Sequence, residues 1–365
     1  MSLKLLLIAS FFVALLAMLG TAPMVRRLAV QLKPRKIHSQ TPVGAGGISL
    51  AVALLLVSFY LLPLPASASP LLAGIGIVLL FNGLLWWRLP PQRARIWRNR
   101  LGPFVMVLVV PILIGIPADL IFDYTGAILT VGFATAVSLT PLALAGLGDR
   151  FPVRSTMSPS YLVVPAMLGI ITISLNADFS GGPAFRSMID VMQVFLPTLG
   201  AIAGCSFYTF RLPWRNSSQV CMGASGQMMM GLIFGWAAME VAAAAPRPGA
   251  TMVALLWMML PALFEVAREQ IRVRIAPTLD PSQVDPRIIC LLLAPSSARF
   301  IYGNAIAMLI AGLISFWSPF ISVWASGVAI PFVFIAYVIG GGWLSDLLGS
   351  SQASLPPYKS SDTRR

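Results

Sequence analysis

Long apolar stretches dominate this sequence of 365 residues. A helix that crosses a bilayer needs about 20 mostly apolar residues, and eleven stretches come close to that length. They cover 4–24, 47–63, 70–87, 102–118, 126–147, 159–175, 191–210, 226–244, 250–268, 299–317 and 320–344. Charged residues make up only 10% of the chain, against about 25% in a soluble domain. This excludes a soluble globular enzyme and predicts an all-α, polytopic integral membrane protein.

The segments between these stretches alternate sharply in charge. All lysines and arginines except Lys4, Arg186 and Arg247 fall on one predicted side of the membrane. The positive-inside rule then places the N-terminus outside, with five basic loops and a basic C-terminal tail in the cytoplasm. The net charge of +13 is explained by this topology, and it requires no nucleic-acid partner.

Separate predictions apply to the N-terminal and the C-terminal segments. A cleaved signal peptide would fit Lys4, the apolar run after it and Gly20-Thr21-Ala22. Arg26 and Arg27 follow directly and favour a retained first helix. We expect residues 1–349 to form a single transmembrane domain and residues 350–365, rich in Ser and Pro, to form a disordered cytoplasmic tail.

The first basic loop has the composition of a phosphate-binding segment. Arg35, Lys36 and His38 precede Gly46-Gly47 at the start of the second apolar stretch. Arg binds phosphate with a planar fork and Lys with a point charge, while glycines allow close approach of the backbone. The alternative is a basic cluster that sets topology and touches anionic lipid.

Two motifs resemble a known family. Arg35-Lys36-x-His38 with Gly46-Gly47 resembles the first cytoplasmic motif of the polyprenyl-phosphate N-acetylhexosamine-1-phosphate transferase superfamily (glycosyltransferase family 4, the WecA, TagO and MraY enzymes). The fourth basic loop and its flanks, 199–227, are similar to a second family passage and include Gly223 and Gly226. The resemblance implies eleven spans with the N-terminus outside, and a bacterial inner (plasma) membrane protein of cell-envelope polysaccharide synthesis. Members transfer a sugar-1-phosphate from a UDP-sugar to a polyprenyl phosphate with Mg²⁺.

The sequence departs from the family where the carboxylates should stand. Trp86-Trp87 occupies the place of a paired-Asp motif, and Ala224 the place of a metal-binding Asp. An indole or a methyl group offers no oxygen ligand to Mg²⁺. The fifth loop, about 269–298, has no histidine where the family has a His-x-His cluster, and its Asp280 and Asp285 are typical turn residues beside prolines.

One carboxylate, Asp149, lies near a family motif. In the alignment that follows topology, Ala145 replaces the first Asp of the fifth span's motif and Asp149 survives one place out of register. In an alternative alignment, 146–151 is a shifted paired-Asp motif. Glu265 and Glu269 lie one helical turn apart and are expected to pair with nearby arginines.

These observations predict a degenerate member of the family, a pseudoenzyme. We expect it to bind a polyprenyl phosphate or a UDP-sugar through Arg35, Lys36, His38, the glycines of the two motifs and the second-loop arginines. It could act as a homodimer or beside a partner membrane enzyme. Two alternatives stay open: an active Mg²⁺-dependent transferase with a rearranged site at Asp149, and a transporter or lipid translocase. Cys205, Cys221 and Cys290 predict no disulfide framework and no metal site.

Overall fold

The computed structural model describes five long segments and parts of four shorter ones. The long segments are 46–60, 69–88, 183–209, 223–244 and 248–275, and the shorter parts lie within 8–23, 101–105, 135–140 and 325–336. Every described residue is helical, so the prediction of an all-α chain is confirmed for this part of the sequence. The predicted tail, 350–365, lies outside the described residues.

The long segments coincide with the second, third, seventh, eighth and ninth predicted apolar stretches. They form α2 (Gly46–Tyr60), α3 (Ser69–Arg88), α7 (Pro183–Thr209), α8 (Gly223–Ala244) and α9 (Pro248–Ile275). Two bounds differ from the prediction by more than three residues, because α7 begins before residue 191 and α9 continues beyond residue 268. Both extensions contain charged residues, which a search for apolar runs excludes although they are compatible with a helix.

None of the helices in the described part of the chain is sufficiently long and apolar to pass through a membrane. Of the six other predicted stretches, 4–24 is described in part, and the rest lie wholly or largely outside the described residues. The arrangement of eleven spans therefore stays a prediction.

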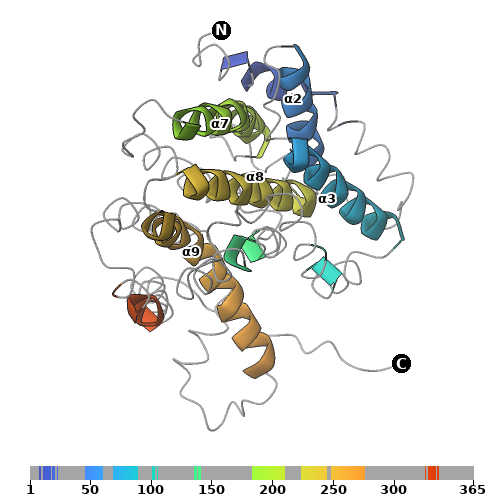
Figure 1. Cartoon of the computed structure of the whole chain (residues 1–365). Helices are drawn as coiled ribbons and strands as arrows, with labels where there is room; N and C mark the ends of the chain where they lie inside the picture. Colours follow the sequence, from blue (N-terminus) through green and yellow to red (C-terminus); the bar gives the residue numbers. More distant parts are fainter. Residues whose placement is uncertain are drawn as a thin grey trace, which may run out of the picture.

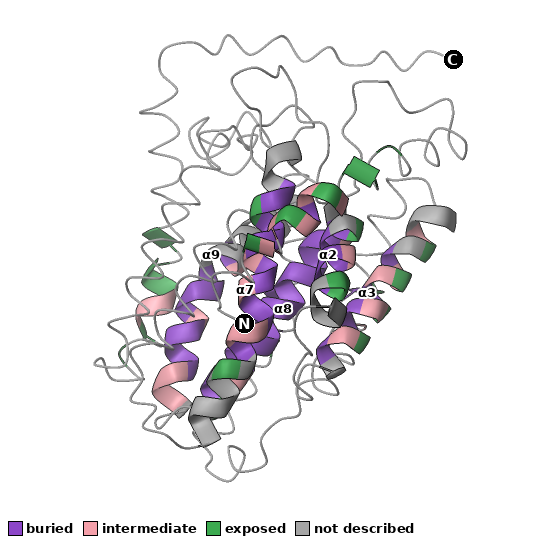
Figure 2. Cartoon of the chain, turned by 90° about the horizontal axis from the view of Figure 1, so that it is seen from above, coloured by how far each residue is buried: buried purple, intermediate pink, exposed green. Residues whose placement is uncertain are grey.

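Helix α8 is the centre of the described bundle. It packs against α2, α3, α7 and α9 (Figure 1). Every residue from 226 to 239 is buried, and Figure 2 shows α8 as a buried helix among partly exposed ones. Its sequence is apolar around the whole helix, with small Gly and Ala residues between large Met, Ile and Trp residues. A helix that is apolar on all sides is stable only inside a core or a membrane.

Two glycines let neighbouring segments approach closely. A Cβ atom on Gly204 of α7 would collide with the backbone oxygen of Phe11 and lie 2.9 Å from the Ala14 Cβ. A Cβ atom on Gly235 of α8 would lie 2.6 Å from the Val137 Cγ1. Each glycine follows another by four residues, which is the Gly-x-x-x-Gly spacing found where membrane helices pack closely.

Helix α9 uses two faces. Met252, Leu255 and Met259 belong to the main core with α8. Val253, Trp257, Leu260 and Phe264 form a second stripe that packs against Ala329 and Ile330. Their spacing of four, three and four residues keeps the second stripe on one side of the helix. Helix α9 therefore lies between α8 and the segment within 325–336.

The outer helices expose apolar side chains in stripes. Helix α3 exposes Ile77, Leu80 and Leu84, which share one helical face. The segment within 8–20 exposes Ile8, Phe12, Leu16 and Leu19 in the same way. In Figure 2, exposed residues alternate with more buried ones along helix α3. Both helices are thus apolar on their inner and their outer faces.

Candidate functional site

The glycines of the two motifs lie at helix starts. Gly46 and Gly47 are in the first turn of α2, and Gly223 and Gly226 are in the first turn of α8. Gly47 and Gly226 are buried. Each start is the place where backbone N–H groups have no acceptor within the helix. The ionisable residues predicted beside them, Arg35, Lys36, His38 and Asp149, lie outside the described residues.

The end of α3 meets the start of α8 through a buried amide. Asn82 Nδ2 donates a hydrogen bond to the Val78 backbone oxygen at 2.9 Å and lies 3.1 Å from the Met228 Sδ. Asn82 is only 7% exposed. It stands one and a half turns before the end of α3, and Met228 stands about as far after the start of α8. The sequence analysis did not single out Asn82, although an amide within an apolar run marks an inward-facing position.

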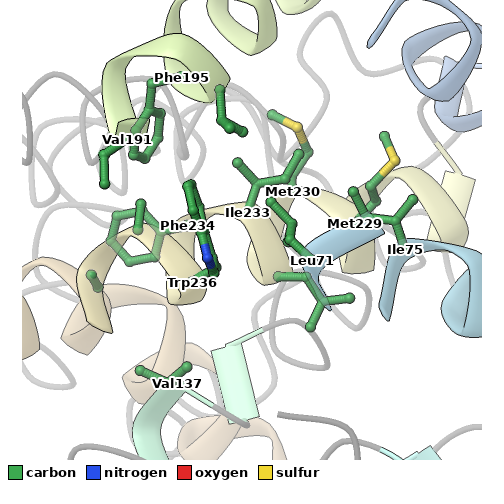
Figure 3. Close-up of a cluster of buried hydrophobic side chains, with 14 of the residues drawn as sticks. Leu71, Ile75, Val137, Val191, Phe195, Met229, Met230, Ile233, Phe234 and Trp236 are labelled. Carbon is green, nitrogen blue, oxygen red and sulfur yellow. The ribbon is translucent and has the colours of Figure 1, made fainter. Parts of the chain in front are cut away.

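The two helices run in opposite directions. Figure 3 shows Leu71 of α3 on the side of Ile233, and Ile75 beside Met229. Residues further along α3 therefore face residues nearer the start of α8. The contact between Asn82 and Met228 follows the same pattern. The final residues of α3 and the first residues of α8 lie at the same end of the helix pair.

This end carries two of the positions at which the resemblance implies carboxylates. Trp86 follows Asn82 by one helical turn, and Ala224 precedes Met228 by one turn. Neither residue type fits a bound Mg²⁺, which takes carboxylate, phosphate and water oxygens. Among the residues that the structure describes, no group of three or more His, Cys, Asp or Glu residues could hold a metal ion.

Among the residues that the structure describes, the buried polar side chains are uncharged. Thr140 and Thr198 donate their hydroxyls to the backbone oxygens of Ala136 and Val194, each at 2.7 Å. Gln227, in the first turns of α8, is 1% exposed. A hydroxyl that bonds the carbonyl four residues earlier is satisfied within its own helix, so it can face an apolar neighbour at little cost.

Two buried tryptophan side chains differ from these hydroxyl groups. Trp236 and Trp257 are buried, and their Nε1 atoms have no hydrogen-bond partner among the described residues. In the close-up of the core, Trp236 lies beside Phe234, with Val137 on the far side of α8 from Phe195 (Figure 3). Both indoles serve as apolar volume in the core.

Other residues that the sequence analysis weighed have no described role in the site. Glu265 and Glu269 lie in α9, which continues into the predicted fifth loop as far as Ile275. Cys205 is a buried free thiol of α7. Asp280, Asp285, Cys221 and Cys290 lie outside the described residues.

Comparisons with protein-family models and with curated proteins identify no relative of this chain. No family model matches this chain, and no curated protein matches it at a significant level. The resemblance to the transferase superfamily therefore rests on the sequence motifs alone.

Proposed function

We propose that this chain is a multi-pass protein of the bacterial inner membrane that has the architecture of the polyprenyl-phosphate N-acetylhexosamine-1-phosphate transferases and binds one of their ligands without catalysing their reaction. It would act as a partner or regulator in cell-envelope polysaccharide assembly, as a homodimer or beside another membrane enzyme. One observation carries the proposal: at the shared end of α3 and α8, Trp86 and Ala224 stand where the resemblance implies carboxylates.

The exposed apolar stripes support a membrane setting. Leu80, Leu16 and Phe332 are all about two-thirds exposed, and each belongs to a helical segment with further exposed apolar residues. Soluble monomers rarely expose contiguous apolar patches beyond a few hundred Å². Lipid chains solvate such faces, and packing through glycines with internally bonded hydroxyls is typical of helices in lipid.

The position of the basic motif supports ligand binding. Arg35, Lys36 and His38 precede α2 by about ten residues, and α2 packs against α8. Hydrogen bonds to charged groups contribute about 1.5–3 kcal/mol each. Three such donors that act together on one phosphate group would therefore hold it with useful affinity.

The missing carboxylates argue against turnover. Phosphoryl transfer depends on groups that hold the metal and stabilise charge in the transition state. Losing one such electrostatic contact costs about 10²–10³ in rate. This chain departs from the family in the third-span, fifth-span, fourth-loop and fifth-loop motifs together.

The active alternative depends on one residue. Asp149 is the carboxylate that lies near a family motif in the sequence, and it lies outside the described residues. A single carboxylate could hold Mg²⁺ together with substrate phosphates.

Release of UMP distinguishes the two functions. The purified protein would be incubated in detergent with polyprenyl phosphate, Mg²⁺ and a panel of UDP-N-acetylhexosamines, with Asp149→Asn as the comparison. We expect no UMP from either protein. UMP from the wild type that is lost in Asp149→Asn would establish the active alternative.

Ligand binding tests the proposal itself. We expect Lys36→Ala with His38→Ala to weaken binding of polyprenyl phosphate or UDP-sugar about tenfold or more, the equivalent of one lost charged hydrogen bond. Arg247→Ala, on the opposite predicted side of the membrane, is the matched control and should bind normally. Unchanged binding in the double variant would contradict the proposed site.

A further inference from the structure

We propose that one buried water molecule joins the indole of Trp236 in α8 to the backbone oxygen of Val137, in the helical segment within 135–140. The site takes a small molecule that accepts one hydrogen bond and donates another, which is the chemistry of water. The inference concerns how two parts of the bundle are joined, and it holds whichever of the proposed functions applies.

The donor is the Nε1–H group of Trp236. This residue is 1% exposed, and its Nε1 has no hydrogen-bond partner among the described residues. A buried N–H group without an acceptor is costly in an apolar core. In Figure 3 the nitrogen lies at the end of the indole ring that is directed toward Val137. The ring fills volume in the core, and its N–H group still requires an acceptor.

The acceptor is the backbone oxygen of Val137. In a helix this oxygen accepts a hydrogen bond from the N–H group four residues later. Residue 141 is a proline, which has no N–H group, so the Val137 oxygen lacks its usual helical donor. The hydroxyl of Thr140 does not replace that donor, because it donates to the backbone oxygen of Ala136 at 2.7 Å.

The donor and the acceptor lie at one close contact between the two segments. A Cβ atom on Gly235 would lie 2.6 Å from the Val137 Cγ1 and 3.6 Å from the Val137 backbone oxygen. Trp236 is the next residue of α8, so its Cα lies about 3.8 Å from that of Gly235. The Val137 oxygen is therefore held beside α8 at the level of Trp236.

A water molecule suits this pair better than a direct hydrogen bond. Val137 is a described residue, and the Trp236 Nε1 makes no hydrogen bond to any described residue. Water can accept from the indole and donate to the carbonyl, and a buried water typically makes about two to four such bonds. Thr140 lies within one helical turn of Val137 and is 2% exposed. Its oxygen keeps a free lone pair after it donates, so it offers a third partner.

Nuclear magnetic resonance of the indole protons tests the proposal. Full-length protein with isotope-labelled tryptophan would be studied in detergent, and the Trp236 signal is the one that disappears in Trp236→Phe. We expect an Overhauser contact between the Trp236 indole proton and water, measured in the rotating frame, where such contacts and proton exchange have opposite signs. Absence of any contact between this proton and water would overturn the proposal.

Two proline substitutions test the acceptor. Pro141→Ala supplies an N–H group to the Val137 oxygen, so the water loses a partner and we expect its contact with Trp236 to weaken at least about twofold. Pro197→Ala is the matched control, because it supplies an N–H group to a carbonyl of α7 and should leave the contact with Trp236 unchanged. An equal contact in Pro141→Ala and in the wild type would show that the water does not bind Val137, and the inference would fall.

The same spectra distinguish a direct bond from a bridging water. If the wild type shows no water contact and Pro141→Ala still shifts the Trp236 signal alone, the indole bonds the carbonyl directly and the water site is overturned. If Trp236→Phe does not fold, the other tryptophans are replaced one at a time, and the indole signal that persists in every variant is that of Trp236. The decisive spectrum is then still that of the wild type.

Discussion

Helices α8 and α3 are similarly apolar, yet their surroundings differ. The residues of α8 are buried without interruption from 226 to 239. Helix α3 buries Leu71, Ile75, Val78 and Asn82 on one face and exposes Ile77, Leu80 and Leu84 on another. Apolar content therefore predicts that a helix avoids water, but it does not identify the neighbours against which that helix packs. The polar Asn82, on the buried face of α3, distinguishes the inner face better than any apolar residue does.

The substitution with the largest expected effect on stability is Trp236→Ala in α8, the buried helix of this comparison. Trp236 is 1% exposed and its Nε1 has no hydrogen-bond partner in the described part of the chain, so we attribute its contribution to packing. We expect a loss of about 3–5 kcal/mol in the free energy of unfolding, measured by denaturant titration of the purified protein. Trp236→Phe keeps most of the volume and should cost clearly less. A loss under about 1 kcal/mol for Trp236→Ala would contradict the central role of α8.

The second test concerns close helix approach. Gly204→Ala places a Cβ against the Phe11 backbone oxygen, and we expect it to destabilise the protein by about 1–3 kcal/mol. Gly76→Ala in α3 is the matched control, because no atom of the described residues lies within 4 Å of its added Cβ. Thermal unfolding of both variants measures the difference. Equal melting temperatures would mean that residues 11–15 do not pack on α7 as described.

The third test concerns the buried amide of α3. Asn82→Leu removes the contact to Met228, but the Val78 oxygen keeps its backbone helix bond, so no buried group loses its only partner. We expect the free energy of unfolding to change by less than about 1 kcal/mol. A loss of about 3 kcal/mol or more in denaturant titration would show that Asn82 serves another polar group.

The smallest effect is expected on the outer face of α3. Leu80 is 69% exposed, and Leu80→Ala should change the free energy of unfolding by about 0.5 kcal/mol or less. The same titration as for Trp236→Ala allows a direct comparison. A cost similar to that of a core substitution would reveal a protein partner on this face.

The sequence predicts the helices well and their ends less well. Apolar runs located α2, α3 and α8 to within a few residues, because a bilayer-length run has few alternative structures. The start of α7 at Pro183 and the end of α9 at Ile275 were missed, since Arg186, Asp190, Glu269 and Arg272 interrupt the apolar pattern without breaking the helix.

The candidate site could be predicted only in its parts. The motifs placed Gly46 and Gly47 at a helix start, and Gly223 and Gly226 in the fourth loop and its flanks, which is local information. That Trp86 and Ala224 share one end of a helix pair depends on a contact between residues 82 and 228, which are far apart in sequence. No periodicity within either helix contains that information.

The central place of α8 also has a consequence for biosynthesis. Its partners α2, α3 and α7 all precede it in the chain, and α9 follows directly. While the ribosome has completed only the first 222 residues, the inner faces of these three helices lack the partner that buries them. The nascent chain must therefore wait for one late segment before its core can close, and over that interval it depends most on chaperones and is most exposed to proteases.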